Sequence, residues 1–175
     1  LNYRKKLWSR EKARIVMSEL MQYVDISIGN EEDAADVFGI QAAESDITKG
    51  QLSMEGYKDV AQKLMEKFSL KGVAITLRES YSASDNGWSA LYYDGKELYA
   101  SRKYKVHIVD RVGGGDSFGG GLIYALLNGY NPQDAVEFAV AASCLKHTIV
   151  GDFNHVTVKE VENLAKGDAS GRVQR

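Results

Sequence analysis

The chain has 175 residues, of which 44% are hydrophobic and 26% are charged, with a formal net charge of −2. This length and hydrophobic content suffice for the core of one globular domain, which excludes a disordered tail. The near-neutral balance of interspersed charges gives no electrostatic basis for binding nucleic acid or an anionic membrane surface.

The single cysteine, Cys144, lies in an apolar run. It excludes an intrachain disulfide and indicates a buried, inert thiol, as in the reducing cytoplasm. The sequence shows no charged-then-apolar leader and no apolar run long enough to span a bilayer. We therefore expect a soluble cytoplasmic protein with no membrane partner.

The first elements are a helix, a strand and the start of a second helix. Ser9 is a candidate N-cap for an amphipathic helix, and residues 24–28 form a short apolar strand. Residues 29–33 then turn directly into an acidic helix start. Because ligands bind at such strand-to-helix corners, Asn30, Glu32 and Asp33 could hold Mg²⁺ beside phosphates. The alternative is that these carboxylates only match the helix dipole.

The middle of the chain alternates between loop, helix and strand patterns. Residues 39–52 are polar and irregular, and apolar residues at helical spacing predict a helix over 53–69. Residues 72–77 form a continuous apolar run typical of a buried parallel strand, with Arg78 just past its C-terminal end. Alternating residues on both sides of Asp94-Gly95 predict a β-hairpin.

Residues 106–129 are the stretch that indicates chemistry. An apolar strand over 106–109 leads into Gly113, Gly114 and Gly115 and then into a helix that ends at Gly129. Three residues without Cβ let backbone N–H groups approach a ligand closely, and the positive end of the helix dipole attracts the same anion, above all phosphate.

Asp116 follows this glycine loop directly, where a phosphate would repel its carboxylate. A general base that accepts the proton of a substrate hydroxyl explains the position. The alternative is that Asp116 only caps the helix or matches its dipole. Against it stand Gly119, Gly120 and Gly121, which each cost a helix about 1 kcal/mol relative to Ala and are tolerated where something must approach closely.

The last elements are two helices. Asn131 and Pro132 form an N-terminal cap, and residues 135–145 are apolar on nearly every face, which predicts a buried helix. Residues 157–160 form a capping box for a final short helix. Helices alternate with apolar strands and no linker divides the chain, so we expect residues 1–175 to form a single α/β unit with a sheet covered on both sides.

Residues 110–116, Asp-Arg-Val-Gly-Gly-Gly-Asp, resemble the second signature of the ribokinase-like (PfkB) carbohydrate kinases, Asp-x-x-Gly-Ala-Gly-Asp. Arg111, Val112 and Gly114 depart from the common pattern in a way that recurs in the 2-keto-3-deoxygluconate kinase branch. The resemblance implies a three-layer α/β/α ribokinase-like fold with a mostly parallel sheet plus a β-hairpin. It also implies that this chain is the C-terminal half of that fold, with the N-terminal half absent.

The function implied by the resemblance is ATP-dependent phosphorylation of the primary hydroxyl of a sugar acid, most of all 2-keto-3-deoxygluconate, with ATP and Mg²⁺. Asp116 would be the catalytic base, and the amides of Gly113, Gly114 and Gly115 would hold the transferring phosphoryl. The opening residues 1–8 resemble a phrase of the branch, in which Arg4 contacts the substrate carboxylate and Asn2 faces the nucleotide. From the residues alone, a solvated basic run over Arg4, Lys5 and Lys6 is the favoured interpretation.

The resemblance also extends to the metal and nucleotide residues. Asn30 to Asp33 are similar to the family motif Asn-x-x-Glu, tied to Mg²⁺ and phosphate, and whether Glu32 or Asp33 carries that role stays open. Arg78 lies where the family has a loop bordering the nucleotide, and Ser143 belongs to the helix that borders the adenine.

Two rival interpretations remain. Residues 115–119 formally match the Gly-x-Ser-x-Gly elbow of serine hydrolases, with Ser117 as nucleophile, but three glycines separate the preceding strand from that serine. Alternatively, the chain is a catalytically incomplete nucleotide-binding fragment, because the family's substrate pocket comes largely from the N-terminal half. The sequence leaves open which sugar acid is used, whether the protein forms a homo-oligomer, and whether it requires a monovalent cation.

Overall fold

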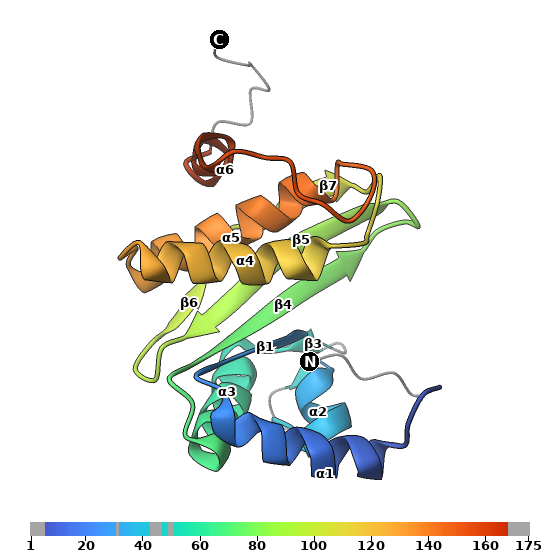
Figure 1. Cartoon of the computed structure of the whole chain (residues 1–175), viewed down its shortest axis with the longest axis vertical. Coiled ribbons are helices and arrows are strands. Elements are labelled where there is room, and N and C mark those ends of the chain that lie inside the picture. Colours follow the sequence, from blue (N-terminus) through green and yellow to red (C-terminus); the bar gives the residue numbers. More distant parts are fainter. Residues whose placement is uncertain (1–5, 31, 43–46, 49–50, 168–175) are drawn as a thin grey trace. The chain divides into compact units, whose positions relative to one another are not determined.

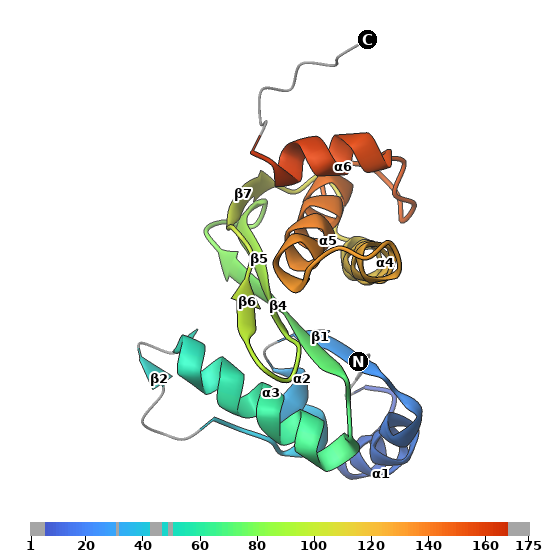
Figure 2. The ribbon, with the colours of Figure 1, turned by 90° about the vertical axis from the view of Figure 1, so that its left-hand side faces the viewer.

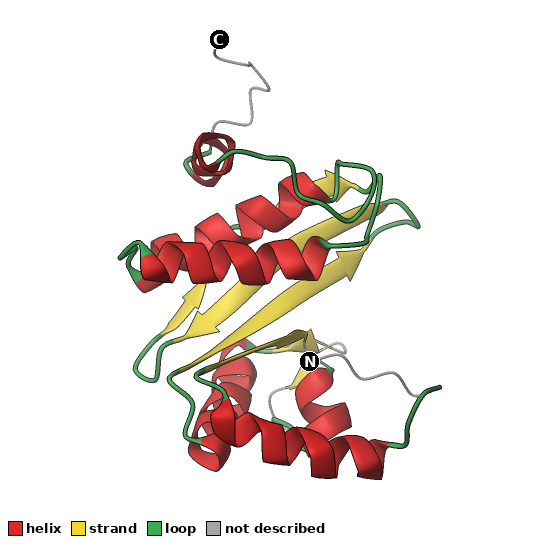
Figure 3. Cartoon of the chain, viewed as in Figure 1, coloured by secondary structure: helices red, strands yellow, loops and turns green. Residues whose placement is uncertain are grey.

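The computed structural model describes residues 6–30, 32–42, 47–48 and 51–167, which form helices and strands in α/β order (Figures 1 and 3). The chain divides into two compact units. The first contains Leu1–Thr76 and Leu91–Leu98, and the second contains Leu77–Ala90 and Tyr99–Arg175. Asn2 and Arg4, the predicted nucleotide and substrate contacts, lie outside the described residues.

The main sheet has the strand order β1-β4-β5-β6, with β7 paired to β5. Its strands are β1 (Ile26–Asn30), β4 (Gly72–Ser80), β5 (Asp85–Tyr93), β6 (Leu98–Ala100) and β7 (Tyr104–His107). Strand β1 runs parallel to β4, with Ile26 opposite Gly72, and β7 runs antiparallel to β5, with His107 opposite Asp85. Strands β4 and β5 contribute residues to both units.

The first unit surrounds the β1–β4 ladder with helices. These are α1 (Arg10–Leu20), the 3₁₀ turn Met21–Tyr23, α2 (Asp33–Phe38) and α3 (Met54–Phe68). Ser9 caps α1 through a hydrogen bond from the Lys12 N–H, as its sequence position predicts. The apolar stripe of α3 is buried, and its last residue, Phe68, packs against Phe38 with ring centroids 4.9 Å apart.

The second unit is built on α4 (Gly114–Leu127), α5 (Pro132–Lys146) and α6 (Val158–Ala165). Helices α4 and α5 lie side by side in both Figures 1 and 2, with Phe118 and Leu122 of α4 buried. Helix α5 is buried on nearly every face, as predicted, because its residues 135–144 are small or apolar except for Glu137 and Ser143. Cys144 is among them and is buried, as predicted, and burial raises its pKa to about 11, which favours the protonated thiol.

Three boundaries differ from the sequence predictions. Strand β4 continues to Ser80, so that Arg78 lies within the strand. The polar end of β4 is a strand because it pairs with β5, which follows after a short turn. In this turn the Tyr81 and Ser82 N–H groups donate to the Asp85 carbonyl. The expected loop over 39–52 contains a short antiparallel ladder of β2 (Ile47–Thr48) and β3 (Gln51–Leu52).

The third difference is the strand before the glycine loop, which ends at His107, and Val109 is 54% exposed. The Val109 and Asp110 N–H groups instead donate to the His147 carbonyl, which takes them out of the ladder. Among the helices that the structure describes, none combines the length and the apolar character needed to cross a membrane.

Candidate active site

The glycine loop is shaped by close contacts with the end of α5 and with the loop that follows it. Gly113 is the N-cap of α4 and has φ = +79°, a left-handed conformation that glycine adopts without strain. A Cβ on Gly113 would collide with the Asp152 carbonyl, and a Cβ on Gly114 would lie 2.7 Å from the His147 ring. Gly115, in contrast, faces open space. The loop therefore needs its first two glycines for packing and keeps the third side free for a ligand.

Backbone N–H groups in the first turn of a helix have no partners within their own helix. At the start of α4 the Gly114 N–H makes a long hydrogen bond of 3.4 Å to the Arg111 carbonyl. The N–H groups of this turn lie at the positive end of the dipole of a 14-residue helix. Together with the open side of Gly115, this arrangement can bind an anion through main-chain donors. It has the geometry required to hold a phosphoryl group.

Asp116 is the third residue of α4, and its side chain is exposed. Within the described part of the chain, no hydrogen bond or ion pair holds its carboxylate. It borders a groove of about 510 Å³ whose walls come from α4, α5, the 152–157 segment and the start of α6. The groove residues include Ser117, Gly120, Gly121, Tyr124, Ala142, Phe153 and Asn154. A free carboxylate beside main-chain donors can accept a proton from a hydroxyl group placed at the same point.

Buried hydrogen bonds fix the loop from below. The Ser143 hydroxyl donates to the Gly114 carbonyl at 2.7 Å, and Ser143 is fully buried. His147 Nδ1 lies 2.7 Å from the Ser143 carbonyl, so the neutral ring carries its proton on Nδ1 and donates there. Ser143 thus supports the loop from the interior of α5 and presents no side chain to the groove.

Asp110, the first acid of the signature, connects two loops. One carboxylate oxygen accepts the Val112 N–H and the other accepts the Gly151 N–H, at 3.0 and 2.9 Å. These hydrogen bonds lower the pKa of Asp110, and the charge of Lys146 lowers it further. The ionised carboxylate therefore ties the 110–113 loop to the 149–152 segment.

Arg111, the second residue of the signature, is not part of the groove. Its guanidinium donates to the Ala83 carbonyl at 2.7 Å and to the Asn86 side-chain oxygen at 3.1 Å. Asn86 is fully buried and also donates to the Glu79 carbonyl and to Ser80 Oγ. Arg111 therefore anchors the signature to the β4–β5 turn.

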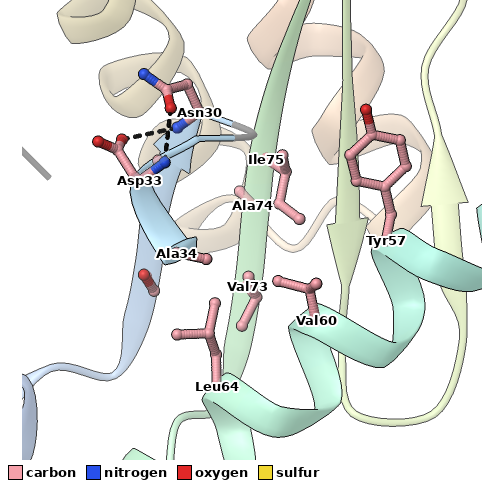
Figure 4. Close-up of a pocket in the computed structure, with 11 residues that line it drawn as sticks. Asn30, Asp33, Ala34, Tyr57, Val60, Leu64, Val73, Ala74 and Ile75 are labelled. Atoms are coloured by element: carbon pink, nitrogen blue, oxygen red, sulfur yellow. Dashed lines mark hydrogen bonds between the residues drawn. The ribbon is translucent and has the colours of Figure 1, made fainter. Parts of the chain in front are cut away.

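Asn30 and Asp33 lie in the first unit and hold each other (Figure 4). The Asn30 side-chain oxygen accepts the Glu32 and Asp33 N–H groups, and the Asp33 carboxylate accepts the Asn30 N–H, each at 2.9 Å. Burial raises the pKa of Asp33, against the lowering effect of that hydrogen bond. The adjoining pocket, lined further by Val60, Leu64 and Val73, has a volume of about 20 Å³, enough for a water molecule but not for a nucleotide.

The predicted metal ligands thus also cap the start of α2. In the portions of the chain that the structure describes, no three His, Cys, Asp or Glu side chains cluster as a metal site. Glu32 is exposed, and one Asp33 oxygen accepts no hydrogen bond from the described residues. Their role in binding Mg²⁺ stays a prediction, as do the roles of Asn2, Arg4 and Arg78.

Ser117, the nucleophile of the hydrolase alternative, is the fourth residue of α4, and its N–H donates to the Gly113 carbonyl. A nucleophile elbow requires its serine at a sharp turn directly after a strand, with histidine in reach. Here β7 ends ten residues earlier, and no hydrogen bond joins Ser117 to a histidine in the described chain. This geometry gives the hydrolase interpretation no support.

Lys146, His147 and Asp110 support the loop, although no sequence motif predicts this role. Lys146 and His147 are both buried at the C-terminal end of α5, where they lie against Gly113 and Gly114. In the sequence, Lys146 and His147 are marked out by their position directly after a long apolar run. That position does not say which loop they contact.

Comparison with known proteins decides the family. Residues 1–155 match the model of the pfkB family of carbohydrate kinases. The chain belongs to this family. A 2-dehydro-3-deoxygalactonokinase of Haloferax volcanii is 31% identical over 172 residues, which cover 98% of this chain and 47% of that protein. The chain spans about half the length of the curated relatives it matches.

Solved structures of family members confirm the ribokinase-like α/β fold. A 2-dehydro-3-deoxygluconokinase from Thermotoga maritima is 48% identical with a TM-score of 0.88, and the match covers 95% of this chain and 49% of that one. A PfkB family carbohydrate kinase from Listeria grayi is 30% identical with a TM-score of 0.80, covering 95% and 48%. The exposed Asp116 and the glycine loop of this pfkB chain therefore lie on the fold that its sequence resemblance implied.

Proposed function

We propose that this chain carries the phosphoryl-transfer site of an ATP-dependent kinase for 2-keto-3-deoxygluconate or a closely related sugar acid. The observation that supports it is the exposed carboxylate of Asp116, which lies one residue after main-chain donors and beside a groove of about 510 Å³. No structural partner in the described residues accounts for that carboxylate. A base beside an anion site is what transfer of a phosphoryl group to an alcohol requires.

In the proposed reaction, Asp116 accepts the proton of the primary hydroxyl as its oxygen attacks the γ-phosphorus of ATP. The bond between the γ-phosphorus and the β,γ-bridging oxygen breaks, and ADP leaves. The amides of Gly114 and Gly115 and the dipole of α4 stabilise the negative charge on the transferring group. The groove beside Gly120, Phe153 and Asn154 accepts the nucleotide, with its mixture of apolar and polar walls.

The sugar acid is proposed from the relatives whose names specify one. The names of the Thermotoga maritima and Haloferax volcanii relatives specify the gluco and galacto forms of a 2-dehydro-3-deoxy sugar acid. The higher identity of the former, 48% against 31%, favours the gluco form. Arg4 is proposed to pair with the substrate carboxylate through its guanidinium and Asn2 to face the nucleotide.

Mg²⁺ is proposed as the metal, because the number of carboxylates at the start of α2 matches the number that it takes from a protein. Mg²⁺ keeps several waters and takes only one or two carboxylates, and the exposed Glu32 with the free oxygen of Asp33 supplies that number. When bound, the ion would supply positive charge for a phosphate ligand. We also propose that the kinase works in the cytoplasm, where ATP is available and a thiol such as Cys144 stays reduced.

The test is a substrate screen with the whole protein. ATP, Mg²⁺ and a panel of sugars and sugar acids would be supplied, including both epimers of 2-keto-3-deoxy sugar acid, and ADP release would be followed. We expect ADP release to depend on the sugar acid and to be fastest with the gluco form. If no sugar acid raises ADP release above the sugar-free background, the proposed function is wrong.

The same screen applied to the isolated 175-residue chain tests the fragment alternative. The chain spans about half of its relatives, so we expect it to bind nucleotide but to turn over sugar acid far more slowly than the whole protein. Equal turnover by the two would show that the chain holds the complete substrate site.

A further inference from the structure

Lys146, the last residue of α5, is fully buried. A buried ammonium group loses its hydration, and this cost is tolerated only when the charge has partners or a task. Within the residues that the structure describes, the Lys146 Nζ atom donates one hydrogen bond, to the Ile149 carbonyl at 3.1 Å. A methionine would fill nearly the same volume without the desolvation cost, so packing does not explain a lysine here.

The position of the charge is specific. The Lys146 Cε atom lies 3.2 Å from where a Cβ on Gly113 would be, so the side chain runs directly against the glycine loop. Its charge is also felt by Asp110, whose pKa is lowered first by the Val112 and Gly151 N–H groups and then by Lys146. The ammonium group therefore lies between the 110–113 loop and the 149–152 segment, close to both.

The ends of two helices act on the Lys146 charge in opposite directions. Lys146 is in the last turn of α5, where the negative end of the helix dipole favours its charge, and it lies against the first turn of α4. Gly113 is the N-cap of α4, and the N-terminal end of a helix already carries positive charge. A second positive charge beneath it raises the electrostatic cost, and Asp110 compensates only in part because its oxygens are shared with two backbone N–H groups. An anion bound on the open side of the loop makes the position of the charge more favourable, because the positive potentials of the α4 dipole and of the lysine add there.

We propose that Lys146 is a positioning residue whose buried ammonium group acts as a built-in cation beneath the phosphate-binding loop, fixing Gly113 against the 149–152 segment and favouring the bound phosphoryl group. The proposal rests on the proposed function. It also has a consequence for ions in solution, since a fixed ammonium group leaves nothing for an added monovalent cation to do at this point. The wild-type protein should work equally well in sodium, potassium or tetramethylammonium salts.

The test compares two neutral variants of the whole protein that differ in the space they leave. Lys146→Met removes the charge and keeps the volume, whereas Lys146→Ala removes the charge and leaves a cavity beside the Ile149 carbonyl and Asp110. Lys12→Met, on the exposed face of α1, is the control for loss of one lysine charge. Each variant would be assayed in ammonium chloride and, at equal ionic strength, in tetramethylammonium chloride, whose cation is too large for the cavity.

We expect both Lys146 variants to fold and to lose about 10- to 100-fold in kcat/KM for ATP, the scale found for partners that orient a site without touching the ligand. Ammonium should restore a substantial part of the activity of Lys146→Ala and none of that of Lys146→Met, where the thioether blocks the space. Wild type and Lys12→Met should respond equally to the two salts.

Wild-type activity in Lys146→Met would overturn the proposal, because the charge would then contribute nothing to phosphoryl binding. Failure of that variant to fold would also overturn it, since the ammonium group would then serve stability. Equal restoration of Lys146→Ala by both salts would refute a local cation effect.

Equilibrium binding of a non-hydrolysable ATP analogue is measured in parallel. If the wild type phosphorylates no sugar acid, the proposed function fails, and ammonium-dependent binding by Lys146→Ala still decides the role of the lysine.

Discussion

The imidazole ring of His147 lies against Gly114, so closely that a Cβ atom on residue 114 would be 2.7 Å from both Cε1 and Nε2. This contact gives a physical reason for Gly114, where the family signature usually has Ala. The ring is itself held by Nδ1, which donates to the Ser143 carbonyl, and Ser143 Oγ donates to the Gly114 carbonyl. Helix α5 and the glycine loop therefore constrain each other through three residues.

Gly114→Ala should destabilise the protein by about 1–3 kcal/mol, the usual cost of adding a methyl group to a filled space. Adding His147→Ala should remove most of this penalty, because the shortened side chain no longer meets the new methyl group. The measurement is the free energy of unfolding of the single and double variants, which gives their coupling energy. Gly115→Ala is the matched control: nothing lies within 4 Å of its Cβ position, so it should leave stability unchanged or slightly higher. Additive penalties for the first pair would contradict the contact.

His147 should make the protein less stable in mild acid. Burial lowers its pKa, with smaller contributions from the charges of Lys146, Arg111 and Arg78, against the raising effect of the hydrogen bond to Ser143. In the unfolded chain the ring titrates near 6.5. Between that pH and the lower folded pKa, the unfolded state binds more protons, so stability falls as the pH falls through this window.

The measurement is the free energy of unfolding of the wild type and of His147→Gln between pH 5 and pH 8. We expect the variant, which cannot titrate at this position, to show a flatter pH dependence over the acid part of the range. His155→Gln, at an exposed position, should retain the wild-type slope. If His147→Gln has the same slope as the wild type, the buried ring is not the source of the acid sensitivity.

Asp116→Asn in the whole protein should lower turnover at least about a hundredfold, the scale expected for loss of a general base. The amide has nearly the same shape and cannot accept the proton, while the main-chain donors of the loop are unaffected. Nucleotide affinity, measured by equilibrium titration, should therefore persist or rise slightly through loss of a negative charge beside the phosphates. Turnover comparable to the wild type would show that Asp116 only matches the helix dipole.

Gly120→Leu should lower nucleotide affinity without lowering the stability of the fold. Gly120 borders the groove, and nothing lies within 4 Å of its Cβ position, so a leucine fits the fold and removes a helical glycine that costs about 1 kcal/mol. We expect an equal or higher melting temperature together with a loss of nucleotide affinity, because the new side chain fills the groove. Ile123→Trp, an enlargement on the exposed surface of α4 outside the groove, should leave affinity unchanged. Unchanged affinity in Gly120→Leu would place the nucleotide elsewhere.

The sequence by itself determined the elements whose signals are local. The N-caps at Ser9 and Asn131, the capping box at Thr157, the αL glycine at 129 and the buried face of α5 appear as predicted, since each depends on residues a few positions apart. The signature over 110–116 likewise located the glycine loop and Asp116, because the residues that make an anion site at a helix start are consecutive.

Only the tertiary structure decided what lies beneath that loop. Gly113 and Gly114 are required by a carbonyl, a lysine and an imidazole more than thirty residues later, and Asp110 meets Gly151 across a similar gap. The polar end of β4 became a strand because β5 pairs with it, which its own composition does not show. Such contacts depend on how α5 packs on α4, and packing is set by the shape of the assembled core and not by any short stretch of sequence.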